Sequence, residues 1–82
     1  FSDLDADIQS NPENQNLTLG KDFTYSGTGN VIEISKDIVI DGDGHTIDAD
    51  GKVSIFDITN NSHVILKNII FANLSNLFYH DK

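Results

Sequence analysis

The stretch that decides the fold is KDIVIDGDGHTIDAD, residues 36–50. Two short apolar runs, at 38–40 and 46–47, are separated by two Asp-Gly pairs. Alternation with a period of two is typical of β-strands, and Gly and Asp are turn-forming residues. Such brief strands between sharp turns predict a chain that bends round corners rather than folding back as one long hairpin.

The same pattern recurs along the rest of the chain. Short β-prone runs lie at 17–19, 23–25, 31–34, 38–40, 46–47, 53–58, 64–66, 69–71 and 77–79. They fall into three sets of three, marked by Leu17, Ile38 and Val64, by Phe23, Thr46 and Ile69, and by Ile32, Phe56 and Phe78. A period near 23 residues with three strands per repeat predicts an all-β, right-handed parallel β-helix of about three coils.

Alternation within each run predicts which side chains point into the core. The inward set is Leu17, Leu19, Ile38, Ile40, Val64 and Leu66 in the first ladder, Phe23, Tyr25, Ile47, Ile69 and Phe71 in the second, and Ile32, Ile34, Phe56, Ile58 and Phe78 in the third. The competing architecture is an antiparallel sandwich, in which Asp41-Gly42 would close a hairpin. Most runs are shorter than such a sandwich prefers, and the regular period favours the β-helix.

Residues 1–10 have the spacing of a short amphipathic helix. Phe1, Leu4 and Ile8 share one face, and Pro12 ends the helix. We expect this face to cover the open end of the first coil. The predicted organisation is therefore a capping helix and loop at 1–15, followed by β-helix coils at 16–82 that form the N-terminal fragment of a longer solenoid.

Composition excludes several classes of partner. The 82 residues carry a formal net charge of −8, with no arginine and only scattered lysines, so we expect no binding to nucleic acid or to anionic membranes. No apolar run is long enough to insert into a membrane, and there is no cysteine to form a disulfide. Because the chain begins with Phe rather than Met, we expect a mature or excised fragment.

Residues 38–76 resemble the repeats of right-handed parallel β-helix proteins. More narrowly, they resemble adhesin-like surface proteins of methanogenic archaea, within the pectate-lyase-like superfamily. The similarity lies in IVIDGDGHTID at 38–48, in IFDIT at 55–59 and in VILKNIIFAN at 64–73. The resemblance implies a non-catalytic structural or adhesive role at the N-terminal end of a β-helical stalk, in an extracellular or cell-surface protein.

Many β-helix proteins act on polysaccharides, so the enzyme hypothesis needs a test. Pectate lyases of the fold that this chain resembles use an arginine as base, and this chain has no arginine. Glycosidases need paired carboxylates around the sugar. Glu33 and Asp57 are the available pair, but three coils form a short groove for a polymer. We therefore predict no catalytic residue and no enzyme activity. The alternative is a fragment of a carbohydrate-active enzyme whose active groove lies outside this segment.

The remaining polar candidates favour structural roles. Asp41, Asp43, Asp48 and Asp50 carry oxygen ligands suited to calcium, but their spacing is not that of an EF-hand, so we predict turns and no metal or cofactor site. His45, His63 and His80 are spaced so that they do not stack, and we expect His45 to bond to backbone. Asn16, Asn60 and Asn73 each begin a glycosylation sequon, and the turn positions of Asn60 and Asn73 make them the better acceptors.

The last coil presents an apolar strand edge. Terminal repeats normally need a polar cap, and an uncovered edge invites pairing with another chain. We therefore expect the native protein to continue past residue 82 and this segment to self-associate through that edge. Carbohydrate or another cell surface are further expected partners.

Overall fold

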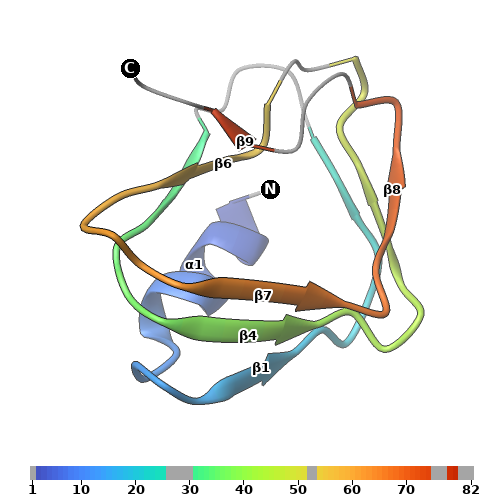
Figure 1. Ribbon diagram of the computed structural model, residues 1–82. Helices are drawn as coiled ribbons and strands as arrows, with labels where there is room; N and C mark the ends of the chain where they lie inside the picture. Colours follow the sequence, from blue (N-terminus) through green and yellow to red (C-terminus); the bar gives the residue numbers. More distant parts are fainter. Residues whose placement is uncertain (1, 26–30, 52–53, 75–77, 80–82) are drawn as a thin grey trace.

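The part of the chain that the structure describes forms one helix and nine short parallel strands. The computed structural model describes residues 2–25, 31–51, 54–74 and 78–79. The elements within these ranges are α1 (Ser2–Ser10), β1 (Asn16–Thr18), β2 (Phe23–Thr24), β3 (Ile32–Ile34), β4 (Ile38–Asp41), β5 (Thr46–Asp48), β6 (Phe56–Ile58), β7 (Val64–Lys67), β8 (Ile70–Ala72) and β9 (Phe78–Tyr79) (Figure 1). Phe1, Val53, Leu77 and His80 lie outside the described residues.

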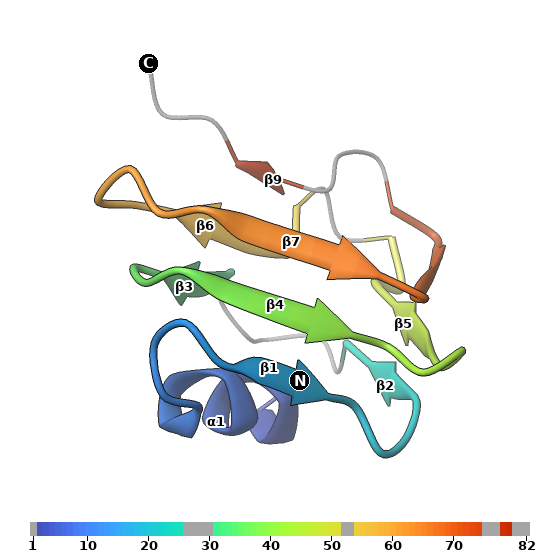
Figure 2. The same cartoon turned by 60° about the horizontal axis from the view of Figure 1, so that its bottom comes forward.

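The strands form three sheets of three strands each, in the orders β1-β4-β7, β2-β5-β8 and β3-β6-β9. Every described pairing is parallel, and each of the strands β1 to β6 pairs with the strand three places further along the chain. The chain thus passes through all three sheets in each of three rounds: β1–β3, β4–β6 and β7–β9. Figure 2 shows β1, β4 and β7 stacked in this order. The arrangement is compatible with a parallel β-helix, and the antiparallel sandwich is wrong.

The observed register corrects two of the predicted stacks. In the first sheet Leu17 aligns with Ile40, not Ile38, and in the second Phe23 aligns with Ile47, not Thr46. The first prediction aligned the starts of two apolar runs 21 residues apart, whereas the observed partners lie 23 residues apart; in the second sheet the observed step is 24 residues instead of 23. The first shift is two residues and therefore keeps the inward face unchanged.

The third sheet has the predicted register. Ile32, Phe56 and Phe78 align across its strands. Ile34 and Ile58 form a second aligned pair in this sheet.

The core is almost wholly aliphatic. Its fully buried side chains include Leu19, Ile32, Ile34, Ile40, Ile47, Ile55 and Phe56. Leu4 and Ile8 of α1 also have no exposed surface, and the helix lies against the first round, beside β1 (Figure 2). Burying each of these two side chains contributes about 1.5–3 kcal/mol. The amphipathic spacing of the helix therefore determines which face meets the strands.

Two turns have the same tight geometry. His45 N–H donates to Gly42 O at 2.9 Å, and Ser62 N–H donates to Thr59 O at 3.1 Å. The two central residues of each turn have positive φ: 52° and 82° at Asp43 and Gly44, and 57° and 54° at Asn60 and Asn61. These angles define type I′ turns, and Asn, Asp and Gly tolerate them best. The Asp-Gly and Asn-Asn pairs therefore place the corners.

Candidate functional site

Side chains at the turns

The polar side chains that the structure organises most clearly are aspartates at the ends of strands. Two of them accept hydrogen bonds both from their own turn and from the next round of chain, namely Asp41 and Asp48. The other two, Asp22 and Asp37, accept hydrogen bonds from the next round. Because all four accept a bond from the adjacent round within a few positions of a strand end, they join neighbouring rounds at the corners where the sheet hydrogen bonds stop.

Asp41 closes β4. Its Oδ1 accepts the backbone N–H of Asp43 at 2.9 Å and the side-chain Nδ2 of Asn68 at 3.1 Å. The first bond is local, whereas the second comes from the following round. The pKa of Asp41 is lowered, chiefly by the Asp43 N–H and then by Asn68, because both donors favour the ionised carboxylate.

Asp48 repeats this arrangement at the end of β5. Its Oδ1 accepts the backbone N–H of Asp50 at 2.8 Å and the Nδ2 of Asn73 at 3.0 Å. The pKa of Asp48 is lowered, first by Asn73 and then by the Asp50 N–H. Asn68 and Asn73 have φ of 56° and 55°, so each supplies a left-handed corner as well as the donor to the round before it.

Asp22 bonds across rounds in another way. Its Oδ1 accepts the backbone N–H of Thr46 at 2.9 Å and lies 3.1 Å from Nδ1 of His45. The pKa of Asp22 is lowered mainly by the Thr46 N–H and then by His45. The sequence predicted a backbone bond for His45, and its N–H does donate to Gly42 O. Its ring, however, meets a carboxylate, which the sequence interpretation missed.

Asp37 and His63 form a second pair of this kind. The backbone N–H of His63 donates to Asp37 Oδ1 at 2.8 Å, and the His63 ring nitrogen lies 3.5 Å from the same oxygen. The His63 side chain is 87% exposed, so the bond from its backbone N–H, rather than the ring contact, joins the two rounds here. His45 and His63 therefore sit beside different aspartates.

Candidates for metal, ligand and modification sites

The four aspartates at 41, 43, 48 and 50 do not form a common ligand cage. Asp41 and Asp48 each direct an oxygen to an asparagine and to a turn amide. Within the described ranges, no three His, Cys, Asp or Glu side chains come together in a way that could hold a metal ion. The aspartates of this stretch thus act as turn residues and as bonds between rounds.

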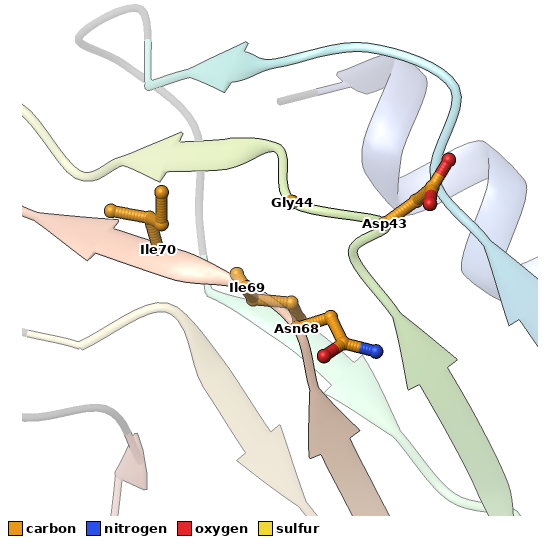
Figure 3. Close-up of a pocket in the computed structure, with 5 residues that line it drawn as sticks. All are labelled: Asp43, Gly44, Asn68, Ile69 and Ile70. Carbon is orange, nitrogen blue, oxygen red and sulfur yellow. The ribbon is translucent and has the colours of Figure 1, made fainter.

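A shallow pocket of about 450 Å³ lies at the corner between β4 and β5, lined by Asp43, Gly44, Asn68, Ile69 and Ile70. Figure 3 shows that its polar groups do not converge. The Asp43 carboxylate and the Asn68 amide point in different directions, and Ile70 points away from both. A ligand here would meet one carboxylate and exposed aliphatic surface, with no set of groups aimed at a single point.

The glycosidase candidates Glu33 and Asp57 are neighbours. They align directly across β3 and β6, on the outward face of that sheet. Thr59 Oγ1 donates to Glu33 Oε2 at 3.3 Å. Paired acid–base catalysis requires two carboxylates whose environments drive their pKa values apart. Glu33 is exposed and Asp57 is half-buried on an open strand face, and neither lines the corner pocket.

The three sequon asparagines occupy different surroundings. Asn60 is exposed at the centre of the 59–62 turn, and Asn16 is exposed on β1. Asn73 is also exposed, but its amide nitrogen donates to Asp48. A glycan on Asn73 would use the nitrogen that makes this bond, so Asn60 is a better acceptor than Asn73.

Comparison with known proteins finds no match: no family model, no curated protein and no solved structure matches the chain. The described helix, α1, is also too short and too polar to cross a membrane.

Proposed function

We propose that this chain is a segment of a right-handed parallel β-helix that serves as a non-catalytic, structural and adhesive part of an extracellular surface protein. In this role it is the capped N-terminal end of a stalk. The right hand follows from the strong preference of parallel strand connections within a sheet. The resemblance of residues 38–76 to adhesin-like repeats supports the surface role.

The observation that carries the proposal is how the turn carboxylates are used. Asp22, Asp41 and Asp48 have lowered pKa values because they accept two hydrogen bonds each. Ionised carboxylates that accept bonds from the adjacent round hold the rounds together and contribute to rigidity. The chemistry of these groups supports a scaffold rather than a catalyst.

Location is tested by brief protease treatment of intact source cells, followed by mass spectrometry of the released peptides. Peptides from this chain should be released before any cytoplasmic marker protein. Recovery of these peptides only after lysis would overturn the surface role.

Catalysis is tested separately, by incubating the purified chain with neutral and acidic polysaccharides and measuring new reducing ends and unsaturated sugars. We expect no product. Product that disappears in the Glu33→Gln, Asp57→Asn double variant would overturn the non-catalytic role and establish the carbohydrate-active alternative.

A further inference from the structure

The third round of strands leaves the apolar interior partly open. Val64, Leu66 and Phe71 are only half-buried although they pack against the core, whereas their sheet neighbours Ile40 and Ile47 are completely buried. No described strand pairs with the outer edge of β7 or of β8. The same round carries the large exposed aliphatic side chains, Ile65 at 56% and Ile70 at 57%.

Among the described residues, those of this edge carry no carboxylate. Twelve of the 13 acidic residues lie at or before Asp57, and none lies between 58 and 80. Within the described third round, Lys67 is the charged residue besides the exposed His63. An acidic protein repels its own copies wherever its carboxylates gather. Here that repulsion is weakest at the round whose apolar side chains are least covered.

The opposite end of the stack is closed. Helix α1 lies against the first round, and its Leu4 and Ile8 are fully buried there (Figure 2). A copy cannot add its third round to this end without displacing the helix. Head-to-tail stacking, which would build an open filament, is therefore blocked. The mode left for two copies joins like edge to like edge, about a two-fold axis.

We infer that the β7 edge binds a second copy of this chain, forming a closed two-fold dimer in which the two β7 strands pair antiparallel. The backbone directions support this pairing. The carbonyls of His63 and Lys67 accept bonds from Ile38 and Gly42, on the side of β4. Since successive residues of a strand alternate, the N–H and C=O groups of Val64 and Leu66 point to the free edge.

One register of the two β7 strands keeps inward and outward side chains on matching faces and also pairs the free backbone groups. With Ile65 on the two-fold axis, Val64 of one copy exchanges both backbone bonds with Leu66 of the other, and both side chains extend the core. Ile65 then covers Ile65 of the second copy on the outer face. Lys67 lies opposite His63, and no carboxylate faces another. The inference concerns this 82-residue chain by itself, because in the proposed stalk a following round would pair with the same edge. It rests on the described strands and does not require a surface location.

The test uses the absence of cysteine, which makes single-cysteine variants unambiguous. Directly opposed residues of a non-hydrogen-bonded antiparallel pair have Cα atoms about 4.5 Å apart, within the range that a disulfide spans. Ile65→Cys should therefore form covalent dimers under mild oxidation at least tenfold faster than Thr18→Cys. Thr18 is the matched control because it is exposed on β1, at the opposite edge of the same sheet.

Sedimentation equilibrium of the full chain gives the second readout. We expect a monomer–dimer equilibrium whose Kd rises at least tenfold in Ile65→Lys, because two lysines would then meet on the axis. The circular dichroism of this variant should be unchanged, since Ile65 is more than half exposed.

Three outcomes would overturn the inference: a monomer at millimolar concentration, an unchanged Kd in Ile65→Lys, or assemblies that grow without limit. Cross-linking of Thr18→Cys as fast as Ile65→Cys would also contradict it. The protease treatment of intact cells is independent of dimerisation, so failure of one proposal does not imply failure of the other.

Discussion

Replacing Gly42 with alanine should destabilise the protein severely, because the third round of chain passes directly over this glycine. A Cβ at this position would lie 2.5 Å from the backbone oxygen of Asn68 and 2.9 Å from Cα of Ile69, and closer still to the Ile69 side chain. Carbon atoms are in optimal contact at about 3.5–4.0 Å, so the obstacle is about 1 Å too near. Most of it is backbone, which no rotamer change can move aside.

The magnitude follows from this overlap. Overpacking that forces backbone to shift typically costs about 1–3 kcal/mol, and Gly42 belongs at the upper end because its own N–H also donates to Lys67 O at 2.8 Å. The whole domain is expected to have roughly 4–12 kcal/mol of stability. A loss of about 2–3 kcal/mol should lower the melting temperature by roughly 10–20 °C.

Alanine variants at two other glycines separate the effect of steric overlap from that of backbone strain. Gly20 has open space at its Cβ position and no positive φ, so Gly20→Ala should change the free energy of unfolding by less than about 1 kcal/mol. Gly44 also has open space but a φ of +82°, so Gly44→Ala should cost about 1 kcal/mol through backbone strain. The expected order of destabilisation is Gly42, then Gly44, then Gly20.

The assay is urea unfolding followed by circular dichroism, which gives the midpoint and the slope for each variant. The slope should stay constant if each variant unfolds in two states. A Gly42→Ala midpoint that matches the Gly20→Ala midpoint would refute the close approach of the third round to this corner.

Three further results are expected. The lowered native pKa of Asp48 means that its stabilising effect is complete above the ordinary aspartate pKa of about 3.9 and is lost as pH falls through the native value. Between about pH 5 and pH 2.5 the unfolding free energy of Asp48→Asn should therefore fall less than that of the wild type or of Asp7→Asn; equal slopes would contradict this. Ile8→Ala should cost about 2–5 kcal/mol by leaving a cavity under α1, and a loss below about 1 kcal/mol by urea unfolding would mean that the helix is not part of the core. Lys36 Nζ donates to the carbonyls of Gln9, at 3.2 Å, and of Asn11, so Lys36→Met should lower stability by roughly 0.5–1.5 kcal/mol; an unchanged melting temperature would show that these bonds add nothing.

The sequence predicted the faces of the strands better than their alignment. Leu17 and Ile40 were both placed inward by alternation alone, and they do lie on one face. Their mutual register was missed because the first residues of the two apolar runs, Leu17 and Ile38, were aligned instead. The pairing starts at Asn16 with Val39, and local alternation fixes the inward face without fixing which residues of two short runs lie side by side.

The same distinction holds for the polar groups. Asp41 and Asp48 were predicted as turn residues, and each does accept the turn amide two residues further along the chain. Their asparagine partners, and the bond from Asp22 to Thr46, join residues 24–27 positions apart. Only stacking of one round on the next brings those groups together, so no local pattern could identify them.

The sequence by itself determined the short strands, the corners at the Asp-Gly and Asn-Asn pairs, the apolar face of the helix and most of the core residues, although Ala49 and Ile55, which are fully buried, were not among those predicted. Each of these follows from the local preferences of a few neighbouring residues and from the period of the apolar side chains. The tertiary structure decided the register of the sheets, the lowered pKa values of the turn aspartates, the exclusion of any side chain at Gly42 and the partly open third round. These depend on contacts between rounds, whose separation along the chain is longer than any local preference reaches.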